Sequence, residues 1–520
     1  MLKVRIGKLL IDERYIIMHV NDASKLELKE GDRVIISSSE KIGRKFIAVL
    51  MLTDKLVNEG EVYIPHEVAS EMDVSEGSYI RINLAPRPKS IDYIKKKMSG
   101  YKLTATEIKV IIEDIVYGRI GKPEIMAFAL SQHYTGMDID EIEYLTKAMI
   151  ETGDVIEFDV PTYDKHSIGG VPGNKVSLLI VPIVAAAGLT IPKTSSRAIT
   201  SPSGTADTME VLANVEFTIE EIREIVSKTN GALVWGGALN LAPADDIIIR
   251  AEKILGIDPT PQMLASIMAK KVAAGIKTLV LDIPTGKETK MEDVEKATQF
   301  ARLFLELGNR LGIRVQVGIT YGEQPVGHAV GPALEAKEAL EALIDPKSAP
   351  ASLVEKSCSL AGLLLEMGGK APVGMGYQLA KEIIESGKAY EKMREIIEAQ
   401  GGDPNIKPDE ISLGEYRYTV YSPVNGFVTQ VSNKIITEIA RAAGAPKDKG
   451  AGVYIYVKRG RKVNAGDKIL EIFAERATKL QDAIAILQRR NPIVIEGMLL
   501  RTIPERQIYT LYPSPSSTNT

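Results

Sequence analysis

The feature that most constrains the fold is the alternation of short apolar strands with helix-length segments between residue 160 and about residue 345. Thr278-Leu-Val-Leu-Asp and Arg314-Val-Gln-Val are strand-like runs, and glycine-rich turns separate such runs from predicted helices. Strands that alternate with helices form βαβ units, whose strands lie parallel in one sheet. The pattern predicts a central α/β domain with a mainly parallel sheet.

The first 84 residues instead contain short β-rich runs and turns. Within them, Leu26-Glu-Leu-Lys-Glu-Gly-Asp-Arg-Val-Ile-Ile resembles Met72-Asp-Val-Ser-Glu-Gly-Ser-Tyr-Ile-Arg-Ile. Two copies of one β unit would form a small pseudo-symmetric barrel. Chance similarity between two turn-strand segments is the alternative, and the sequence leaves both open.

Helical periodicity follows the β-rich region. Thr104-Ala-Thr-Glu is a capping box ahead of an apolar helix, and residues 122–136 and 139–152 continue the helical pattern. Residues 414–505 mix strand-like runs with helical segments at 432–443 and 474–489. We therefore expect a helical domain before the central domain and an α+β domain after it.

Composition excludes several classes of protein. The 64 basic and 68 acidic residues give a net charge of −4, which argues against a broad nucleic-acid-binding surface. The single cysteine, Cys358, rules out an internal disulfide framework and a cysteine-rich metal site. A signal peptide and a run of about 18 apolar residues are both lacking, so we expect a cytoplasmic protein without membrane spans.

The first segment with a chemical signature runs from Asp164 to Ser177, Asp-Lys-His-Ser-Ile-Gly-Gly-Val-Pro-Gly-Asn-Lys-Val-Ser. A glycine-rich loop before a helix directs backbone N–H groups at an anion, and the helix dipole favours negative charge there. Lys165 adds a full charge, and Ser167 and Ser177 add hydroxyl donors. An ordinary βα turn with a solvated lysine is the alternative. The polar residues that flank the turn, Asn174 and Lys175 included, favour phosphate binding.

The second segment, Lys193 to Glu210, carries eight hydroxyl residues between positions 194 and 208. Such composition usually indicates a solvated linker. A linker does not normally place Arg197 among hydroxyls and then continue into a helix, here predicted over 206–213. We interpret the segment as the wall of a phosphate and sugar pocket.

Together these blocks resemble the thymidine/pyrimidine-nucleoside phosphorylase family. The resemblance rests on Lys165-His-Ser-Ile-Gly-Gly-Val171, on Ser195-Ser-Arg197, and on Gly204-Thr205-Ala-Asp207-Thr-Met-Glu210. Two further blocks agree, Ala265-Ser-Ile-Met-Ala-Lys-Lys271 and Gln324-Pro-Val-Gly-His-Ala-Val-Gly-Pro-Ala-Leu-Glu335. The resemblance spans about residues 88 to 500. It implies a phosphate site on the α/β domain and a base site on a helical domain that closes over the substrate.

The resemblance also implies site residues. Inorganic phosphate would be bound by Lys165, Ser167, Ser177, Ser195 and Thr205. Nucleotide contacts would come from Gly170, Ser196, Arg197, Ala198, Ile199, Thr200, Ser201, Thr205, Ser266, Lys270 and Lys290. One departure is the loop Val171-Pro-Gly-Asn-Lys-Val-Ser177, which is one residue longer than is usual in the family.

Three features point to a nucleotide rather than a nucleoside as substrate. The extra β domain and the run Ser196-Arg-Ala-Ile-Thr-Ser-Pro202 resemble an archaeal branch that acts on nucleoside 5′-monophosphates. Nucleoside-specific members also have a histidine at the position of Ser201. The turn Pro284-Thr-Gly-Lys-Glu-Thr-Lys290 adds Lys287 and Lys290, which suit an additional 5′-phosphate. A solvated charged turn is the alternative.

The base site is predicted at a helix start, Asp258-Pro-Thr-Pro-Gln262. Thr260 suits the cap and Pro261 the first helical position. Ser266 and Lys270 then lie on one helix face. The resemblance to the archaeal branch makes Asp258 the general acid that protonates the departing base; a simple turn residue before proline is the alternative.

The implied activity is phosphorolysis of nucleoside 5′-monophosphates, preferably AMP and also CMP and UMP, to free base and ribose 1,5-bisphosphate. Phosphate is a co-substrate, and no organic cofactor or metal is implied. We expect a homodimer or larger homo-oligomer formed through the N-terminal domain. The alternatives are a pyrimidine phosphorylase that acts on nucleosides and a non-catalytic nucleotide-binding assembly protein.

The expected fold class is multidomain α/β, with an N-terminal β-barrel-like domain, a helical domain, a central mainly parallel α/β domain, a C-terminal α+β domain and a disordered tail. The corresponding residues are 1–84, 88–158 joined by about 238–270, 160–237 with 271–405, 414–505, and 513–520.

Overall fold

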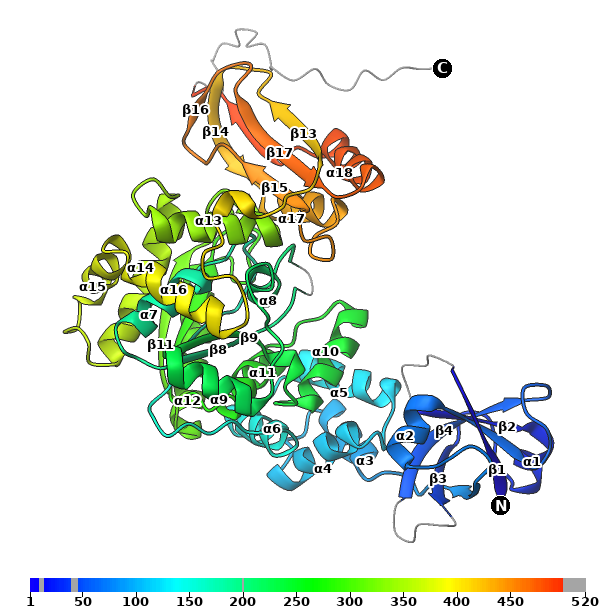
Figure 1. The fold of residues 1–520 in the computed structure, drawn as a ribbon. Helices are drawn as coiled ribbons and strands as arrows, with labels where there is room; N and C mark the ends of the chain where they lie inside the picture. Colours follow the sequence, from blue (N-terminus) through cyan, green and yellow to red (C-terminus); the bar gives the residue numbers. More distant parts are fainter. Residues whose placement is uncertain (9–13, 39–44, 199–200, 499–520) are drawn as a thin grey trace, which may run out of the picture. The chain divides into compact units, whose positions relative to one another are not determined.

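The computed structural model describes residues 1–8, 14–38, 45–198 and 201–498 (Figure 1). Ile199, Thr200 and the tail predicted at 513–520 lie outside the described residues. The chain divides into two compact units. The first contains Met1–Gly153 and Ala242–Ala269, and the second contains Asp154–Leu241 and the chain from Lys270 onward.

The N-terminal strands of the first unit form a closed barrel. Its order is β1 (Leu2–Gly7), β5 (Glu61–Pro65), β2 (Tyr15–His19), β4 (Lys45–Thr53), β3 (Arg33–Ser38) and β6 (Tyr79–Leu84). Alternate side chains of the strands point inward and are buried, as expected for a barrel whose interior is filled by side chains.

The internal echo in the sequence corresponds to a repeated unit of structure. Short helices, α1 (Val20–Lys25) and α2 (His66–Met72), precede the two echoed strands, where the sequence predicted strands and turns alone. A glycine with positive φ follows each helix, Gly31 at 84° and Gly77 at 80°. The two echoed strands, β3 and β6, pair antiparallel with each other.

The rest of the first unit is helical. Its elements are α3 (Ser90–Met98), α4 (Ala105–Val116), α5 (Lys122–Thr135), α6 (Ile139–Glu151), α10 (Pro243–Leu255) and the beginning of α11 (Thr260–Ala273). The predicted capping box is present, since Thr104 Oγ1 accepts from the Glu107 amide and Glu107 accepts from the Thr104 amide. A buried ion pair joins Lys97 of α3 to Glu141 of α6 at 2.8 Å.

The second unit is built on parallel strands. β11 (Arg314–Tyr321), β10 (Thr278–Thr285) and β7 (Tyr163–Ser167) form one parallel sheet, and β8 (Ile191–Ser195) pairs parallel with β9 (Gly231–Trp235). A parallel bridge between Thr162 and Thr190 continues the order from β7 to β8. The mainly parallel central sheet predicted from the strand–helix alternation is confirmed.

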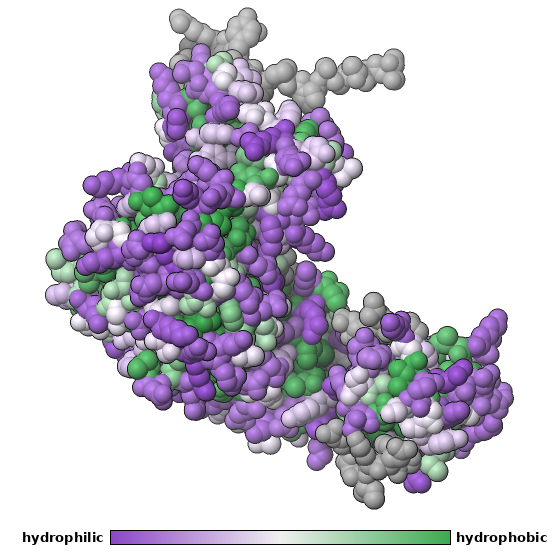
Figure 2. Space-filling view, viewed as in Figure 1, coloured by the Kyte–Doolittle hydropathy of each residue, from purple (hydrophilic) through white to green (hydrophobic). Residues whose placement is uncertain are grey.

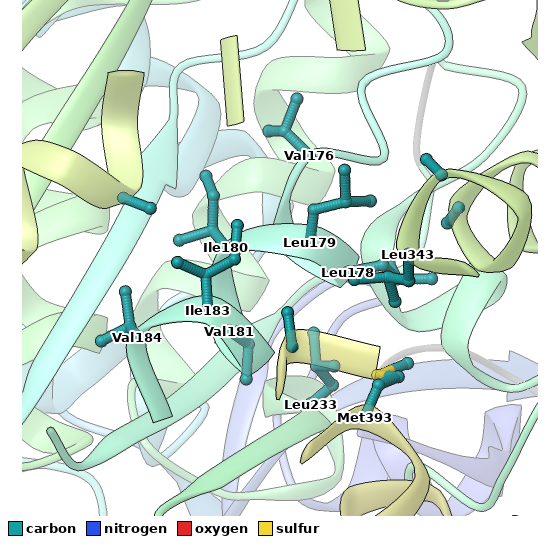
Figure 3. Close-up of a cluster of buried hydrophobic side chains, with 14 of the residues drawn as sticks. Val176, Leu178, Leu179, Ile180, Val181, Ile183, Val184, Leu233, Leu343 and Met393 are labelled. Carbon is teal, nitrogen blue, oxygen red and sulfur yellow. The ribbon is translucent and has the colours of Figure 1, made fainter. Parts of the chain in front are cut away.

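Helices pack around this sheet. They are α7 (Ser177–Ala186), α8 (Thr205–Met209), α9 (Ile219–Thr229), α12 (Val294–Leu311), α13 (Pro332–Ile344), α14 (Ala351–Met367), α15 (Gly376–Glu385) and α16 (Lys388–Ala399). Nearly all of α7 is buried, and Figure 3 shows its aliphatic side chains gathered with Leu233, Leu343 and Met393. The helix predicted over 206–213 is shorter, because α8 ends at Met209.

The C-terminal part of the second unit holds two antiparallel sheets. One contains β12 (Ala329–Val330), β15 (Gly452–Ile455), β17 (Lys468–Ala474) and β13 (Tyr416–Tyr421), and the other contains β16 (Lys462–Val463), β14 (Gly426–Val431) and β18 (Ile493–Glu496). Helices α17 (Asn433–Ala442) and α18 (Ala477–Arg489) complete it. The predicted fold class is confirmed.

The central segment itself contributes an edge strand, β12, to the C-terminal sheet. Hydrophilic residues cover most of the molecular face in Figure 2. Among the residues that the structure describes, no helix is both long and apolar enough to cross a membrane.

Candidate active site

The candidate phosphate site begins at the carboxyl end of β7. This strand carries Asp164, Lys165, His166 and Ser167, and the glycine-rich loop follows it directly. Ligands of parallel α/β sheets bind at the carboxyl ends of the strands, where side chains and loop amides converge. The sheet therefore places the Lys-His-Ser block where an anion can bind.

Lys165 belongs to a buried group centred on Asp282, near the end of the neighbouring strand β10. The ammonium nitrogens of Lys165 and Lys356 lie 3.6 and 3.1 Å from Asp282 Oδ2. Thr320 Oγ1 donates to Asp282 Oδ1 across 2.6 Å. Burial lowers the pKa of Lys165 to about 8 although Asp282 opposes the shift. Burial acts to raise the pKa of Asp282, but Lys356 and Lys165 hold it below its ordinary value.

A second buried group surrounds Asp164. Lys271 Nζ lies 2.5 Å from Asp164 Oδ2, and Lys193 Nζ lies 3.4 Å from Oδ1. Burial lowers the pKa of Lys193 to about 7, against the attraction of Asp164 and with further lowering by Lys271. Burial and the neighbouring lysines, Lys271 first among them, push the pKa of His166 well below its ordinary value. The imidazole is therefore neutral near pH 7.

The two groups together carry excess positive charge. When all four lysines are protonated, four lysines and two aspartates give 4 − 2 = +2, and each of these six side chains is at most 7% exposed; they are Lys165, Lys193, Lys271, Lys356, Asp164 and Asp282. Buried charge without a counterion is costly in free energy. A dianion such as hydrogen phosphate supplies the missing counter-charge, so the cluster is suited to bind it.

The glycine-rich loop leaves β7 directly after Ser167, and the Ile168 amide donates to the Asp282 carbonyl oxygen across 3.1 Å. Gly169, Gly170 and Gly173 have φ of 86°, 95° and 73°, a region that other residues rarely adopt. Ser167 Oγ accepts from Asn174 Nδ2 across 3.1 Å, and Ser177 begins α7 as a buried residue. These positions are consistent with the predicted phosphate contacts of Ser167 and Ser177.

Lys175, one of the polar residues that flank the turn, is engaged elsewhere by the protein. Its ammonium donates to the carbonyl oxygens of Val326 and Ala329, across 3.2 and 2.9 Å, and to Glu338 Oε2 across 2.5 Å. The side chain is fully buried. Lys175 therefore anchors the loop to the segment before α13.

The second predicted segment folds back on itself through Asp207. The Asp207 carboxylate accepts from the amides of Ala198 and Gly204, at 2.6 and 2.9 Å. Ser195 ends β8 and Thr205 begins α8. Ser201 Oγ donates to the Ser203 carbonyl across 3.1 Å. Asp207 thus holds the backbone at Ala198 and at Gly204, on either side of Ser201 in the sequence.

The guanidinium of Arg197 is engaged by the protein itself. It donates to both oxygens of Glu210, at 2.6 and 2.5 Å, and to Glu216 at 2.9 Å. The guanidinium carbon lies 4.6 Å from the ring centre of Trp235. The hydrogen bonds from Arg197 lower the pKa of Glu210 to about 2. The side chain of Arg197 is thus held by Glu210, Glu216 and the ring of Trp235.

The lysine turn, residues 286–290, lies beside the glycine-rich loop after β7, which is the candidate phosphate loop. A Cβ atom placed on Gly170 would come within 3.0 Å of the Lys290 amide nitrogen, so the two backbones are in contact. Two predicted nucleotide residues are therefore neighbours. The side chains of Lys287 and Lys290 are exposed.

The residues predicted for the base lie on and before α11. Ser266 Oγ donates to Asp245 Oδ2 across 2.7 Å, and Gln262 Nε2 donates to Asp245 Oδ1 across 3.1 Å. Asp258 is exposed. Thr260 is itself helical, so α11 begins one residue earlier than predicted and Pro261 is its second residue. Lys270 follows on the same helix as part of the second unit.

Comparison with known proteins identifies the domains of this chain. Residues 91–153 match the helical bundle domain and residues 159–390 the α/β domain of the glycosyl transferase family, and residues 427–494 match the pyrimidine nucleoside phosphorylase C-terminal domain. AMP phosphorylase of Thermococcus kodakarensis is 54% identical over 96% of this chain and 99% of its own length. AMP phosphorylase of Methanocaldococcus jannaschii is 51% identical over the same shares. The chain belongs to the AMP phosphorylase family.

A solved structure adds a comparison at the level of the fold. Anthranilate phosphoribosyltransferase of Thermus thermophilus matches with a TM-score of 0.51 and 22% identity, over 60% of this chain and all of that chain. At this identity the likeness shows a shared fold alone.

In this member of the AMP phosphorylase family, most of the six buried charged residues were not among the site residues predicted from the sequence. Lys193 lies in the segment from Lys193 to Glu210, Lys271 ends the block from Ala265, and Asp282 ends the predicted strand from Thr278. A charged residue within these apolar surroundings could have indicated a buried functional group. Lys356 lies within α14 without any local signal. Across the described ranges, no group of three or more His, Cys, Asp or Glu residues is arranged to hold a metal ion.

Proposed function

We propose that this protein catalyses phosphorolysis of AMP, giving adenine and ribose 1,5-bisphosphate. The observation that carries the proposal is the +2 excess of buried charge beside the glycine-rich loop at the end of β7. The near-full-length similarity to proteins named AMP phosphorylase supports the same activity.

In this reaction a phosphate oxygen forms a bond to C1′ while the bond from C1′ to the base nitrogen breaks. The electron pair of that bond stays on the base, which then takes up a proton. Lys165, Ser167 and Ser177 position the phosphate, whose negative charge stabilises the developing positive charge on the sugar. No covalent enzyme intermediate and no organic cofactor is required.

Asp258 is the proposed proton donor to the base. Removal from water is one way for a carboxyl group to keep its proton near neutral pH. Asp258 is exposed in this structure, so its desolvation has to accompany substrate binding. Ser266, which is held by Asp245, is the proposed contact to the base.

Lys287 and Lys290 are proposed to bind the 5′-phosphate of the substrate. Their turn lies against Gly170 of the phosphate loop, which supports one continuous site for both phosphates. Activity on CMP and UMP, the cytoplasmic location and a homo-oligomer formed through the barrel stay predictions.

Identifying the sugar product tests the proposal. Phosphorus NMR of AMP incubated with enzyme and phosphate should show equal losses of AMP and inorganic phosphate, with two new sugar-phosphate signals. Ribose 5-phosphate without consumption of inorganic phosphate would indicate hydrolysis and contradict the proposal. Ribose 1-phosphate from adenosine or thymidine, with AMP untouched, would favour the nucleoside-level alternative.

A further inference from the structure

The turn between β10 and α12 has an unusual backbone. Glu288, at its centre, adopts φ of 66°, in the left-handed region that a glutamate rarely occupies. Thr289 Oγ1 lies 2.7 Å from the carbonyl oxygens of both Gly286 and Met291 and closes the turn. Such a conformation persists only where surrounding contacts enforce it.

The side chain of Glu288 provides these contacts. Its two carboxylate oxygens accept from Ser432 Oγ at 3.0 and 2.9 Å, and Oε2 also accepts from the Lys434 amide at 3.0 Å. Ser432 caps α17, a helix of ten residues. The carboxylate thus lies at a helix N-terminus, where the helix dipole stabilises negative charge.

The residue after Ser432 also contacts the loop that follows strand β11. Asn433 is buried, and its Nδ2 donates to the Gly322 carbonyl across 2.7 Å, directly after β11. On its other side the turn contacts Gly170. The lysine turn, residues 286–290, is therefore fixed between the phosphate loop and the beginning of α17.

We infer that Glu288 is a positioning residue for substrate specificity, which holds the lysine turn so that Lys287 and Lys290 meet the 5′-phosphate of the substrate. The inference rests on the proposed function and deepens it. Glu288 stands between two lysines in sequence, and an unanchored carboxylate there would offset their charge. Its anchoring at α17 directs that negative charge to the helix N-terminus.

Glu288→Gly tests this inference, because glycine adopts positive φ without strain and removes only the anchor. We expect the KM for AMP to rise about tenfold, the effect of losing a charge-assisted hydrogen bond. The KM for phosphate should stay within about twofold, because the phosphate cluster is untouched, and the melting temperature should stay close to that of the parent. Glu288→Gln keeps an oxygen acceptor and should show a smaller rise.

Ser432→Ala removes the hydroxyl that donates to Glu288. It should likewise raise the KM for AMP and leave the KM for phosphate nearly unchanged. Asp73→Gly is a matched backbone control, since Asp73 has φ of 54° in the barrel, and it should change neither KM. An unchanged AMP KM in Glu288→Gly, or an equal rise in both KM values, would overturn the inference.

Calorimetric binding of AMP separates this inference from the proposed function. A parent protein that binds AMP tightly but does not cleave it with phosphate would refute the proposed activity, and the weaker binding by Glu288→Gly would still support the anchor. A parent that turns AMP over while Glu288→Gly binds AMP equally well would refute the anchor alone. A parent that does not bind AMP would refute both.

Discussion

The ammonium of Lys271 lies 2.5 Å from Oδ2 of Asp164, which joins α11 to the base of the phosphate loop. The other oxygen of Asp164 faces Lys193, so this carboxylate is shared by two lysines. Asp164 therefore holds cations in place. Its buried position next to Lys165 makes the ion pair part of the candidate phosphate site.

Lys165→Ala should abolish most phosphorolysis. The loss of a buried cation that is proposed to contact the attacking phosphate should lower kcat/KM for phosphate by about 10²-fold or more. Steady-state assays with varied phosphate would measure this effect. Lys228→Ala, which removes an exposed lysine paired with Glu224, should leave the rate within about twofold. Unaltered turnover in Lys165→Ala would show that the phosphate assignment is wrong.

Phosphate affinity should fall as pH rises. Burial lowers the pKa of Lys193 to about 7 and that of Lys165 to about 8, whereas the unfolded chain keeps lysine near 10.4. Unfolding of the phosphate-free protein therefore takes up protons between about pH 7 and pH 10, so these lysines make the free energy of unfolding rise with pH in that window. A bound dianion favours the ammonium forms, so phosphate binding also takes up protons.

The fluorescence of Trp235, the single tryptophan, offers a direct readout of this effect, since it lies beside Arg197 in the site. We expect the dissociation constant for phosphate to increase above pH 8, approaching about tenfold per pH unit for one coupled proton. Lys193→Met should flatten the profile. A constant affinity from pH 7 to pH 9.5 would contradict the predicted coupling.

Lys175→Met should weaken phosphate binding without removing any phosphate contact. The loop loses its anchor to Val326, Ala329 and Glu338, so the KM for phosphate should rise several-fold while the KM for AMP changes little. Adding Glu338→Gln removes the unpaired carboxylate and should recover stability but not the phosphate KM.

A matched control for this experiment is Lys97→Met, which breaks another buried lysine–glutamate pair, at 2.8 Å, in the first unit. It should lower the melting temperature by a comparable amount and leave the phosphate KM unaltered. Equal effects of the two variants on the phosphate KM would mean that Lys175 acts only through general stability.

Asp258→Asn should lower kcat for AMP by about 10²-fold, the typical contribution of a general acid. Phosphate binding, followed by the fluorescence of Trp235, should be unchanged because Asp258 belongs to the helical unit. Single-turnover measurements would separate the chemical step from product release. Full activity of the asparagine variant would contradict the role as general acid and indicate that Asp258 is a simple turn residue before proline.

Much of the fold could be predicted because local patterns determine it. The capping box at Thr104 and the strand at Thr278 each follow from a few adjacent residues. The short helices α1 and α2 were missed because six or seven residues within a β-rich region give too little periodicity.

Candidate site residues could be proposed from the sequence where they lie in contiguous loops, as with Ser167 and Gly170. Lys165 and Lys175 show why the other contacts of the site could not be predicted. Both flank the same loop, yet one ammonium joins the anion cluster and the other is held by two carbonyl oxygens and Glu338. That difference depends on a segment about 150 residues away, which local spacing cannot reveal.

Release of adenine from AMP, measured by chromatography with and without phosphate, tests the proposed phosphorolysis directly. Release of base from adenosine and from thymidine is measured in the same way for comparison. We expect adenine from AMP only when phosphate is present, and no base from either nucleoside. Equal release without phosphate, or release from the nucleosides instead, would contradict the proposed phosphorolysis.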